Sequence, residues 1–163
     1  MRVVAQRVSE GAVLVNGQTI GAIARGLVVL AGFAPGDSDE AVEWCADKLV
    51  RLRIFADADG KMNKSIQDVG GAILVVSQFT LYGSVRRGLR PDFGGAAPLE
   101  LARPLYEQFI QRLGHSGLTV QTGQFGAHME VRIVNDGPVT FYIDTDEVMP
   151  HGVRRVSDGA GDA

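Results

Sequence analysis

The stretch Ala72-Ile73-Leu74-Val75-Val76-Ser77-Gln78-Phe79-Thr80-Leu81 decides the fold of this chain. Its first five residues are all apolar, which predicts a buried and central strand. Small hydroxyl and amide side chains follow at once, so the strand ends in hydrogen-bonding groups at the rim of a sheet. A second stretch repeats this arrangement, because Met129–Val134 leads into Asn135-Asp136-Gly137-Pro138-Val139-Thr140. Both stretches predict a polar site built largely from backbone groups and neutral side chains.

Strand patterns fill the first third of the chain and return at its end. Asn16-Gly17 is a strong signal for a two-residue hairpin turn. The continuous apolar run Leu27–Phe33 predicts a strand buried on both faces. Further strands are predicted at 3–8, 12–15, 18–24, 54–55, 118–122, 128–134 and 139–143, the last two forming a hairpin with a turn at Gly137-Pro138.

Two amphipathic helices are predicted between the strands. Residues 38–53 carry apolar side chains at helical spacing, and Asp37 or Ser38 can cap the start. The second helix spans about 98–113, and Pro104 marks either its start near Arg103 or a kink. Its apolar face is expected to comprise Leu101, Leu105, Phe109, Ile110 and Leu113.

The order of these elements predicts an α+β fold in a single domain. Its sheet is expected to be mostly antiparallel and strongly curved or barrel-like, with two main helices. The Gly/Arg/Pro loop at 83–97 is long for a compact domain, so it is a candidate functional loop. The domain is expected to end at 148, and residues 149–163 are expected to form a flexible C-terminal tail.

Composition narrows the class of protein. The chain has 163 residues, 45% hydrophobic and 21% charged, which is ordinary for a soluble globular domain. We expect a cytoplasmic location without membrane association, because the first residues do not form a signal peptide and no apolar stretch is long enough to span a bilayer. A net charge of −3 argues against a protein that coats nucleic acid, so any RNA contact is expected to be local. The best basic cluster is Arg86-Arg87-Gly88-Leu89-Arg90, which a solvated loop explains equally well.

Most familiar catalytic and metal-binding motifs are missing from the sequence. Its three histidines are scattered, and there is no Cys/His cluster at metal spacing, no Gly-x-Ser-x-Gly and no phosphate-binding loop. Ser77 and Thr80 lack a base in sequence, so they suit orienting a water or stabilising an oxyanion better than nucleophilic attack. The residues alone favour a purely structural role, in which both side chains end the strand by bonding to nearby backbone. Phe79 alternates to the opposite face and is expected in the core.

Three further positions are candidate binding residues. The default for Gly137-Pro138 is a turn, and the alternative is a cis peptide bond that aligns two carbonyls as acceptors for an ammonium group. Phe125 lies in a glycine-rich segment and could stack on a nucleobase. Arg7 interrupts an apolar strand, so it needs solvent or backbone carbonyls as partners.

Taken together, these motifs resemble the D-aminoacyl-tRNA deacylase family, in particular its D-tyrosyl-tRNA deacylase-like members. The resemblance covers about residues 1–145 and is most specific in the paired Ser-Gln-x-Thr-Leu and Asn-x-Gly-Pro-Val-Thr motifs. It is supported by Gln6-Arg7-Val8, Arg53-Ile54-Phe55, Gly60-Lys61-Met62-Asn63, Arg87-Gly88, Arg90-Pro91, Phe93, Gln121-Thr122-Gly123 and Phe125. The sequence departs from the family pattern at 83–86 and at Leu89 and Asp92. The resemblance therefore does not predict the contacts of the loop at 83–93.

The resemblance implies a homodimer that needs no metal or cofactor and acts on the 3′ end of aminoacyl-tRNA. It implies hydrolysis of the ester of D-aminoacyl-tRNA, with glycine mischarged on tRNA-Ala as a second substrate. Gly137 and Pro138 would enter the partner's pocket as a cis motif and exclude L-amino acids. Arg7 would orient that motif, and Phe125 and Met129 would lie by the terminal adenine. The implied catalytic segment is Ser77, Gln78, Phe79 and Thr80, acting through main-chain donors and the tRNA 2′-hydroxyl.

Two other functions are compatible with the sequence. One is a non-catalytic nucleic-acid-binding module that uses the same rim, although the short, charge-balanced C-terminal segment disfavours it. The other is a general Ser/Thr esterase, which would need a His or Lys base next to Thr80.

Overall fold

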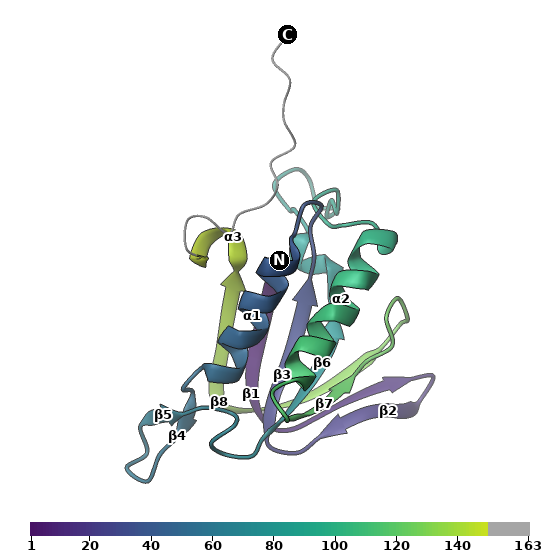
Figure 1. Cartoon of the computed structure of the whole chain (residues 1–163). Coiled ribbons are helices and arrows are strands. Elements are labelled where there is room, and N and C mark those ends of the chain that lie inside the picture. The colour runs from purple at the N-terminus through teal and green to yellow at the C-terminus, as the bar shows by residue number, and fades with distance from the viewer. Residues whose placement is uncertain (150–163) are drawn as a thin grey trace.

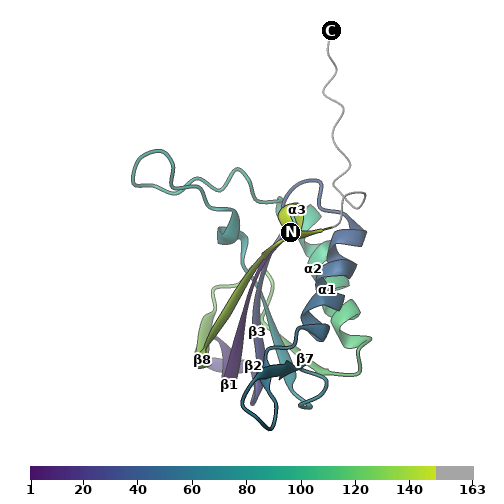
Figure 2. The same ribbon diagram turned by 90° about the vertical axis from the view of Figure 1, so that its left-hand side faces the viewer.

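The fold is a curved sheet with two long helices packed on one face. The computed structural model describes residues 1–149. Figures 1 and 2 show α1 and α2 side by side over the same face of the sheet. The strands are β1 (Arg2–Val15), β2 (Gln18–Ile23), β3 (Gly26–Gly32), β4 (Phe55–Ala56), β5 (Met62–Lys64), β6 (Ala72–Ser77), β7 (Thr119–Thr122) and β8 (Glu130–Asp144). The helices are α1 (Asp39–Arg51), α2 (Leu99–Gly114), α3 (Thr145–Val148) and the 3-10 helix η1 (Phe79–Tyr82).

The main sheet is mixed. Its strand order is β2-β1-β3-β6-β7, and β8 pairs with β1. The pairings of β1 with β2, β3 and β8 are antiparallel, whereas β3–β6 and β6–β7 are parallel. Parallel neighbours need long crossover connections, and the segments containing α1 and α2 supply them. The predicted α+β class and curved, barrel-like sheet are confirmed; within the main sheet the antiparallel pairings all involve β1, and β4 and β5 form a separate antiparallel pair.

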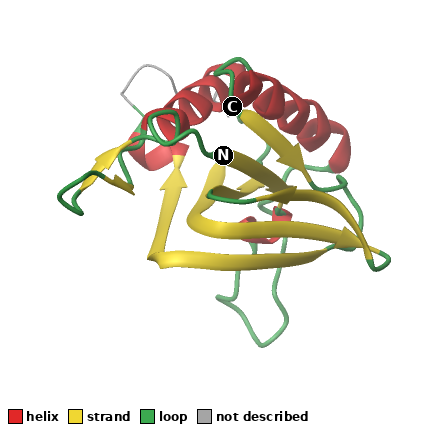
Figure 3. Ribbon diagram, turned by 90° about the horizontal axis from the view of Figure 1, so that it is seen from below, coloured by secondary structure: helices red, strands yellow, loops and turns green. Residues whose placement is uncertain are grey.

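Strand β1 bends the sheet because its two halves have different neighbours. Residues 2–8 pair with β3, and residues 11–15 turn away to pair with β2. Strand β8 follows β1 through both halves, and Figure 3 shows the resulting curvature from below. The predicted hairpin turn is confirmed, with φ of +51° at Asn16 and +78° at Gly17. The two strands predicted at 3–8 and 12–15 are one continuous strand.

The hairpin predicted at Gly137-Pro138 is wrong. Both flanking segments belong to β8 and pair with the same strand, β1. Gln6 lies opposite Thr140 and Val8 lies opposite Asn135, so residues 136–139 all face the single residue Arg7. This segment is therefore a four-residue bulge, and the chain continues in the same direction after it. Sequence alone did not distinguish a bulge from a turn, because Asn, Asp, Gly and Pro favour both.

The main core lies between the sheet and the two helices. Alternate residues of the strands, such as Leu27 and Val29 of β3, pack against α1 and α2 there. The other face of the strands holds a smaller cluster around Val28 and Leu74, enclosed where the sheet curves over itself. Cys45 is buried in the main core, and burial raises the pKa of its thiol to about 12. It is a small apolar core residue rather than a reactive one.

Helix α1 begins as predicted, and α2 has the predicted span of about 98–113 but differs from the prediction in its buried face. The hydroxyl of Ser38 accepts a hydrogen bond from the Ala41 N–H and caps α1. Helix α2 begins at Leu99, so Pro104 lies inside it and does not mark its start. Leu101, predicted on the buried face, is 53% exposed. The buried face of α2 is instead formed by Ala102, Tyr106, Phe109 and Leu113.

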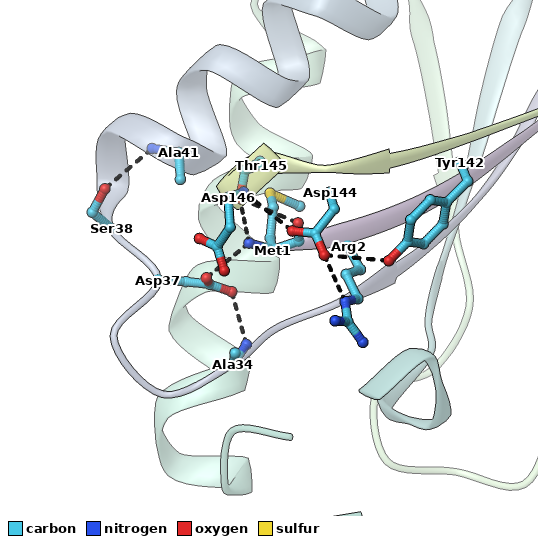
Figure 4. Close-up of polar contacts among 10 residues, drawn as sticks. All are labelled: Met1, Arg2, Ala34, Asp37, Ser38, Ala41, Tyr142, Asp144, Thr145 and Asp146. Carbon is cyan, nitrogen blue, oxygen red and sulfur yellow. Dashed lines mark hydrogen bonds and ion pairs between the residues drawn. The ribbon is translucent and has the colours of Figure 1, made fainter. Parts of the chain in front are cut away.

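The N-terminus and the end of β8 meet in a buried polar network (Figure 4). The Met1 ammonium donates to Asp37 Oδ1 at 2.7 Å and to Thr145 Oγ1 at 2.6 Å. Beside it, Arg2 Nε donates to Asp144 Oδ2 at 2.8 Å. Met149, predicted to start the flexible tail, is buried, and the rest of that tail lies outside the described residues. None of the helices in residues 1–149 has the length and hydrophobicity to cross a membrane.

Candidate active site

A cavity of about 600 Å³ opens where β6 ends. Its walls come from three parts of the chain: the rim formed by β3, β6 and η1, the start of α2, and the segment between β7 and β8. Most of its lining is apolar, with a small number of polar groups, which is typical of a ligand pocket. Its lining residues include Ser77, Gln78, Phe79, Phe93, Ala97, Leu99, Phe125, His128, Met129 and Val131.

The predicted catalytic segment forms one wall of this cavity. Ser77 is the last residue of β6 and lies beside Ala31 of β3. The Gln78 N–H still donates to the Ala31 carbonyl at 2.8 Å, and the chain then turns into η1. Ser77, Gln78 and Phe79 line the cavity, whereas Thr80 lies outside its lining.

Phe79 is not a core residue, contrary to the prediction. It is 58% exposed and packs edge-on against Phe93 with a centroid distance of 5.2 Å. The prediction assumed that strand alternation continues past Gln78, but η1 begins at Phe79 and redirects its side chain. A 3-10 helix leaves its first N–H groups without intrahelical partners, and here these belong to Phe79 and Thr80.

The Thr80 hydroxyl is not set up for nucleophilic attack. It accepts a hydrogen bond from the Gln78 side-chain amide. A nucleophilic hydroxyl instead needs an acceptor, such as a histidine, to remove its proton. Among the described residues, Thr80 has no His or Lys partner, so the geometry gives no support to a general Ser/Thr esterase. The contact instead fixes the Gln78 amide at the rim of the cavity.

Phe125 and Met129 form the opposite wall. The Phe125 ring lies 5.3 Å from the Tyr106 ring and 4.7 Å from the Arg103 guanidinium. The hydroxyl of Tyr106 donates to the Val75 carbonyl at 3.0 Å, and burial raises its pKa to about 12. Tyr106 is therefore a neutral scaffold group that holds Phe125 against the cavity rather than an acid or base at neutral pH.

Several lining residues were not identified as site residues from the sequence, among them Phe93 and His128. Phe93 lies at the end of the predicted functional loop, and His128 lies one residue before Met129. The sequence did contain signals for both residues. Phe93 belongs to a motif of the family resemblance, and His128 is next to the predicted binding residue Met129. The turn between β7 and β8, which orients this segment, is a tertiary feature that spacing does not reveal.

A second candidate surface is the bulge of β8, which contains Gly137 and Pro138. Arg7 of β1 lies opposite this bulge. Arg7 Nε donates to the Asp136 carbonyl at 2.9 Å and Nη1 to the Ile54 carbonyl at 2.6 Å. The Asn135 side chain accepts from the Val139 N–H at 2.8 Å. The Gly137-Pro138 peptide bond is cis, and both residues are exposed. Backbone carbonyls hold the Arg7 charge, as the sequence suggested.

The bulge and the cavity lie at different ends of the sheet. Arg7 pairs with Leu27, whereas Ser77 pairs with Ala31, so the two levels are four residues apart along β3. That separation is about 13 Å along the strands, and three strand spacings from β8 to β6 add about 14 Å across the sheet. A single chain therefore does not bring Gly137 and Pro138 to its own cavity.

No group of three or more potential metal-ligating side chains (His, Cys, Asp or Glu) occurs within residues 1–149. The predicted catalytic segment and the Phe125–Met129 wall meet at one cavity, and the Arg7-held bulge forms a separate exposed surface. The polar side chains that line the cavity are the Ser77 hydroxyl, the Gln78 amide and the His128 imidazole, and backbone groups lie beside them. Hydroxyl, amide and backbone N–H groups orient and stabilise a reacting ester without supplying a charged catalyst.

The chain is similar to known proteins over most of its length. The family model described as D-Tyr-tRNA(Tyr) deacylase matches residues 4–144. A Thermotoga petrophila protein named D-aminoacyl-tRNA deacylase is 55% identical over 148 residues, which cover 91% of this chain and 99% of that protein. A Symbiobacterium thermophilum protein of the same name is 54% identical over 147 residues, covering 90% and 97%.

Two solved structures share the fold. One, described as c-Myc DNA Unwinding Element Binding Protein, has a TM-score of 0.83 at 42% identity and covers 88% of this chain and 98% of that chain. The other, described as a probable eukaryotic D-amino acid tRNA deacylase, has a TM-score of 0.76 at 22% identity, covering 87% and 97%. At that identity, the second likeness concerns the fold alone. The family match and the two relatives establish that the chain belongs to the D-Tyr-tRNA(Tyr) deacylase family, a family of hydrolases.

Proposed function

We propose that this protein hydrolyses the ester between a D-amino acid and the terminal ribose of tRNA, releasing free amino acid and tRNA. The observation that carries the proposal is the cavity at the end of β6, formed by the family's Ser77-Gln78-Phe79 motif and by Phe125 and Met129. Its apolar walls suit a nucleobase, and its rim offers polar groups for an ester. Stacking of the terminal adenine on Phe125 is worth about 1–3 kcal/mol.

Catalysis in this proposal relies on positioning and electrostatics. The N–H groups of Phe79 and Thr80 stabilise the negative charge that develops on the ester carbonyl oxygen. Gln78, held by Thr80, orients the ester at the rim. The substrate's 2′-hydroxyl assists the attacking water. This assignment needs no side-chain base, consistent with the contacts of Thr80.

Selection of the D-amino acid is assigned to the Gly137-Pro138 bulge of a second subunit. The separation of bulge and cavity within one chain supports a homodimer in which each bulge enters the partner's cavity. Gly137 has φ of +151°, and an added Cβ would lie 2.6 Å from the Val139 nitrogen, so this wall presents backbone without a side chain. The carbonyls bind the α-ammonium group and leave no space for an L side chain. Glycine, with no side chain, escapes this exclusion, so glycine mischarged on tRNA-Ala is a second substrate.

The proposal is tested with D-Tyr-tRNA and L-Tyr-tRNA prepared on the same tRNA. We expect rapid release of free D-tyrosine and no release of L-tyrosine above the uncatalysed rate. Hydrolysis of both forms at equal rates would disprove the chiral selection. Gel filtration with light scattering, run alongside, tests the homodimer. We also infer a cytoplasmic location, where the tRNA substrate resides.

A non-catalytic nucleic-acid-binding module is the second candidate. The likeness to the structure described as c-Myc DNA Unwinding Element Binding Protein favours it, because that printed name refers to DNA binding. Gel-shift titration with bare DNA at physiological salt separates the two functions. Tight binding without hydrolysis of D-Tyr-tRNA would favour the module.

A further inference from the structure

A long loop projects from the molecule after η1 (Figure 2), and its sequence is rich in arginine. This Arg arm comprises residues 83–93 and connects η1 to the segment before α2. Its two sides are joined by reciprocal backbone hydrogen bonds, from Ser84 N to Asp92 O at 2.7 Å and from Asp92 N to Ser84 O at 2.9 Å. Gly88 lies at the tip with φ of +68°. The arm is thus a short antiparallel loop with a defined base.

The base of the Arg arm is part of the cavity wall. Phe93 packs against Phe79, and both rings line the cavity. A Cβ placed on Gly83 would lie 3.0 Å from the Phe93 ring, so backbone and ring are in close contact there. Whatever occupies the cavity therefore lies next to the start of the arm.

The Arg arm carries a local positive charge in an acidic protein. Between Asp68 and Asp92 the chain has no acidic residue, and its basic residues are Arg86, Arg87 and Arg90. All three are exposed, and none of them forms an ion pair with another described residue. The whole chain has a net charge of −3, so the arm is a local region of positive charge on a protein that is negatively charged overall.

We propose that the Arg arm binds the phosphates of the RNA strand that leads into the cavity. The inference rests on the proposed function, which places the terminal nucleotide beside Phe125. From Ser84 to Gly88 the arm reaches at most about 13 Å, the length of about four nucleotides at 3.4 Å of helix axis per nucleotide along one strand. Arginine suits this role because its guanidinium fork binds phosphate bidentately. The partner is thus the end of the RNA acceptor arm, held locally by an otherwise acidic protein.

The test compares a large and a small substrate. The arm variant is Arg86→Gln/Arg87→Gln/Arg90→Gln. The matched control, Arg51→Gln/Lys61→Gln/Lys64→Gln, removes the same charge from exposed positions at the end of α1 and around β5. The substrates are D-Tyr-tRNA and D-tyrosyl-adenosine, and binding of uncharged tRNA is followed by fluorescence anisotropy at several salt concentrations.

For the arm variant we expect kcat/KM on D-Tyr-tRNA to fall about 10- to 100-fold at physiological salt, mainly through KM. Three lost phosphate contacts also lower the slope of log affinity against log salt by about 2. Hydrolysis of D-tyrosyl-adenosine is unchanged, and the control variant behaves like the wild type on both substrates.

Three results would overturn the inference. The arm variant could act on D-Tyr-tRNA like the wild type, or lose activity equally on both substrates, which would make the arm a support of the cavity. It could also change the oligomeric state in light scattering, which would make the arm a contact between copies. If the wild type hydrolyses neither substrate, the proposed function fails, and the anisotropy titration still decides whether the arm binds RNA.

Discussion

At the scale of single residues, the candidate site works with neutral groups. Gln78, Thr80 and the first N–H groups of η1 are polar but uncharged, and the hydroxyl of Thr80 accepts a hydrogen bond from Gln78. Tyr106 and Cys45, the two groups whose pKa burial raises to about 12, remain protonated at neutral pH. This favours catalysis by preorganised donors over catalysis by an activated nucleophile.

Thr80→Val tests this assignment. Because the proposed role of Thr80 is only to orient Gln78, we expect kcat on D-Tyr-tRNA to fall by less than about 10-fold, whereas removal of a serine nucleophile costs about 10⁶-fold. Single-turnover kinetics measures the chemical step directly. Thr80→Ser, which keeps the hydroxyl, is the matched control. Full activity of the Ser variant together with complete loss in the Val variant would restore Thr80 as a nucleophile.

At the scale of elements, the bulge of β8 is the unusual feature of the sheet. Residues 136–139 of β8 all lie opposite Arg7 of β1. Hydrogen bonds from Arg7 to the Asp136 carbonyl and from the Val139 N–H to the Asn135 side chain hold this extra backbone in place. Arg7 bonds to the Asp136 carbonyl of β8 and to the Ile54 carbonyl after α1 at the same time. The bulge is therefore held in position rather than left as a loose loop.

Arg7→Lys tests the role of Arg7 in positioning the bulge. Lysine keeps the charge but lacks the planar fork, so it does not hold both carbonyls in the same geometry. A displacement of about 1 Å at a reacting site can cost about 100-fold. We therefore expect kcat/KM on D-Tyr-tRNA to fall about 10- to 100-fold while circular dichroism shows an intact fold. A variant as active as the wild type would show that the bulge keeps its position without the fork.

At the scale of the whole molecule, the N-terminus is bound at the end of β8. The Met1 ammonium, Asp37 and Thr145 link the N-terminus, the loop before α1 and the end of β8. Asp144 next to them accepts from Arg2, from the Asp146 N–H at 3.1 Å and from the Tyr142 hydroxyl at 3.3 Å (Figure 4). Burial would by itself raise the pKa of Asp144, but the hydrogen bonds and nearby positive charges outweigh burial, and the pKa lies below its ordinary value.

This lowered pKa predicts a pH dependence of stability. A carboxylate with a depressed folded-state pKa stabilises the fold above its unfolded pKa, near 3.9, and this stabilisation is lost as pH falls through the folded value. We expect Asp144→Asn to lower the free energy of unfolding by about 2 kcal/mol at pH 7. Urea titrations should show this difference shrinking as pH falls from about 5 to 3. A constant difference would contradict the assignment, and Glu147→Gln is an exposed control.

Mixed dimers test whether the active site is shared between subunits. Gly137→Ala disables the bulge, and Gln78→Trp obstructs the cavity, so each homodimer is expected to be inactive. A heterodimer contains one intact cavity facing one intact bulge. Random mixing makes half the dimers mixed, each with one site, which gives about a quarter of wild-type activity. No recovery on mixing would mean that each cavity uses its own chain or no bulge at all.

The sequence by itself determined the elements and the chemical character of the site. Hydrophobic periodicity, the Asn16-Gly17 turn and the Ser38 cap are local signals, so they located the helices, the first hairpin and the buried strand Ala72–Val76. Four of the predicted site residues, Ser77, Gln78, Phe79 and Phe125, were named from the residues and the family resemblance, and the structure places these four at one cavity, whereas Thr80 lies outside its lining.

Only the tertiary structure decided how these parts are arranged. Several features depend on which strand or helix packs against a given segment. They are the bulge at Gly137-Pro138, the parallel pairing of β6, the exposure of Phe79 and Leu101, and the presence of Phe93 and His128 in the cavity. The same local residues fit a turn or a bulge, and a strand or a 3-10 helix. The choice follows from long-range pairing and burial, which residue spacing along one chain does not encode.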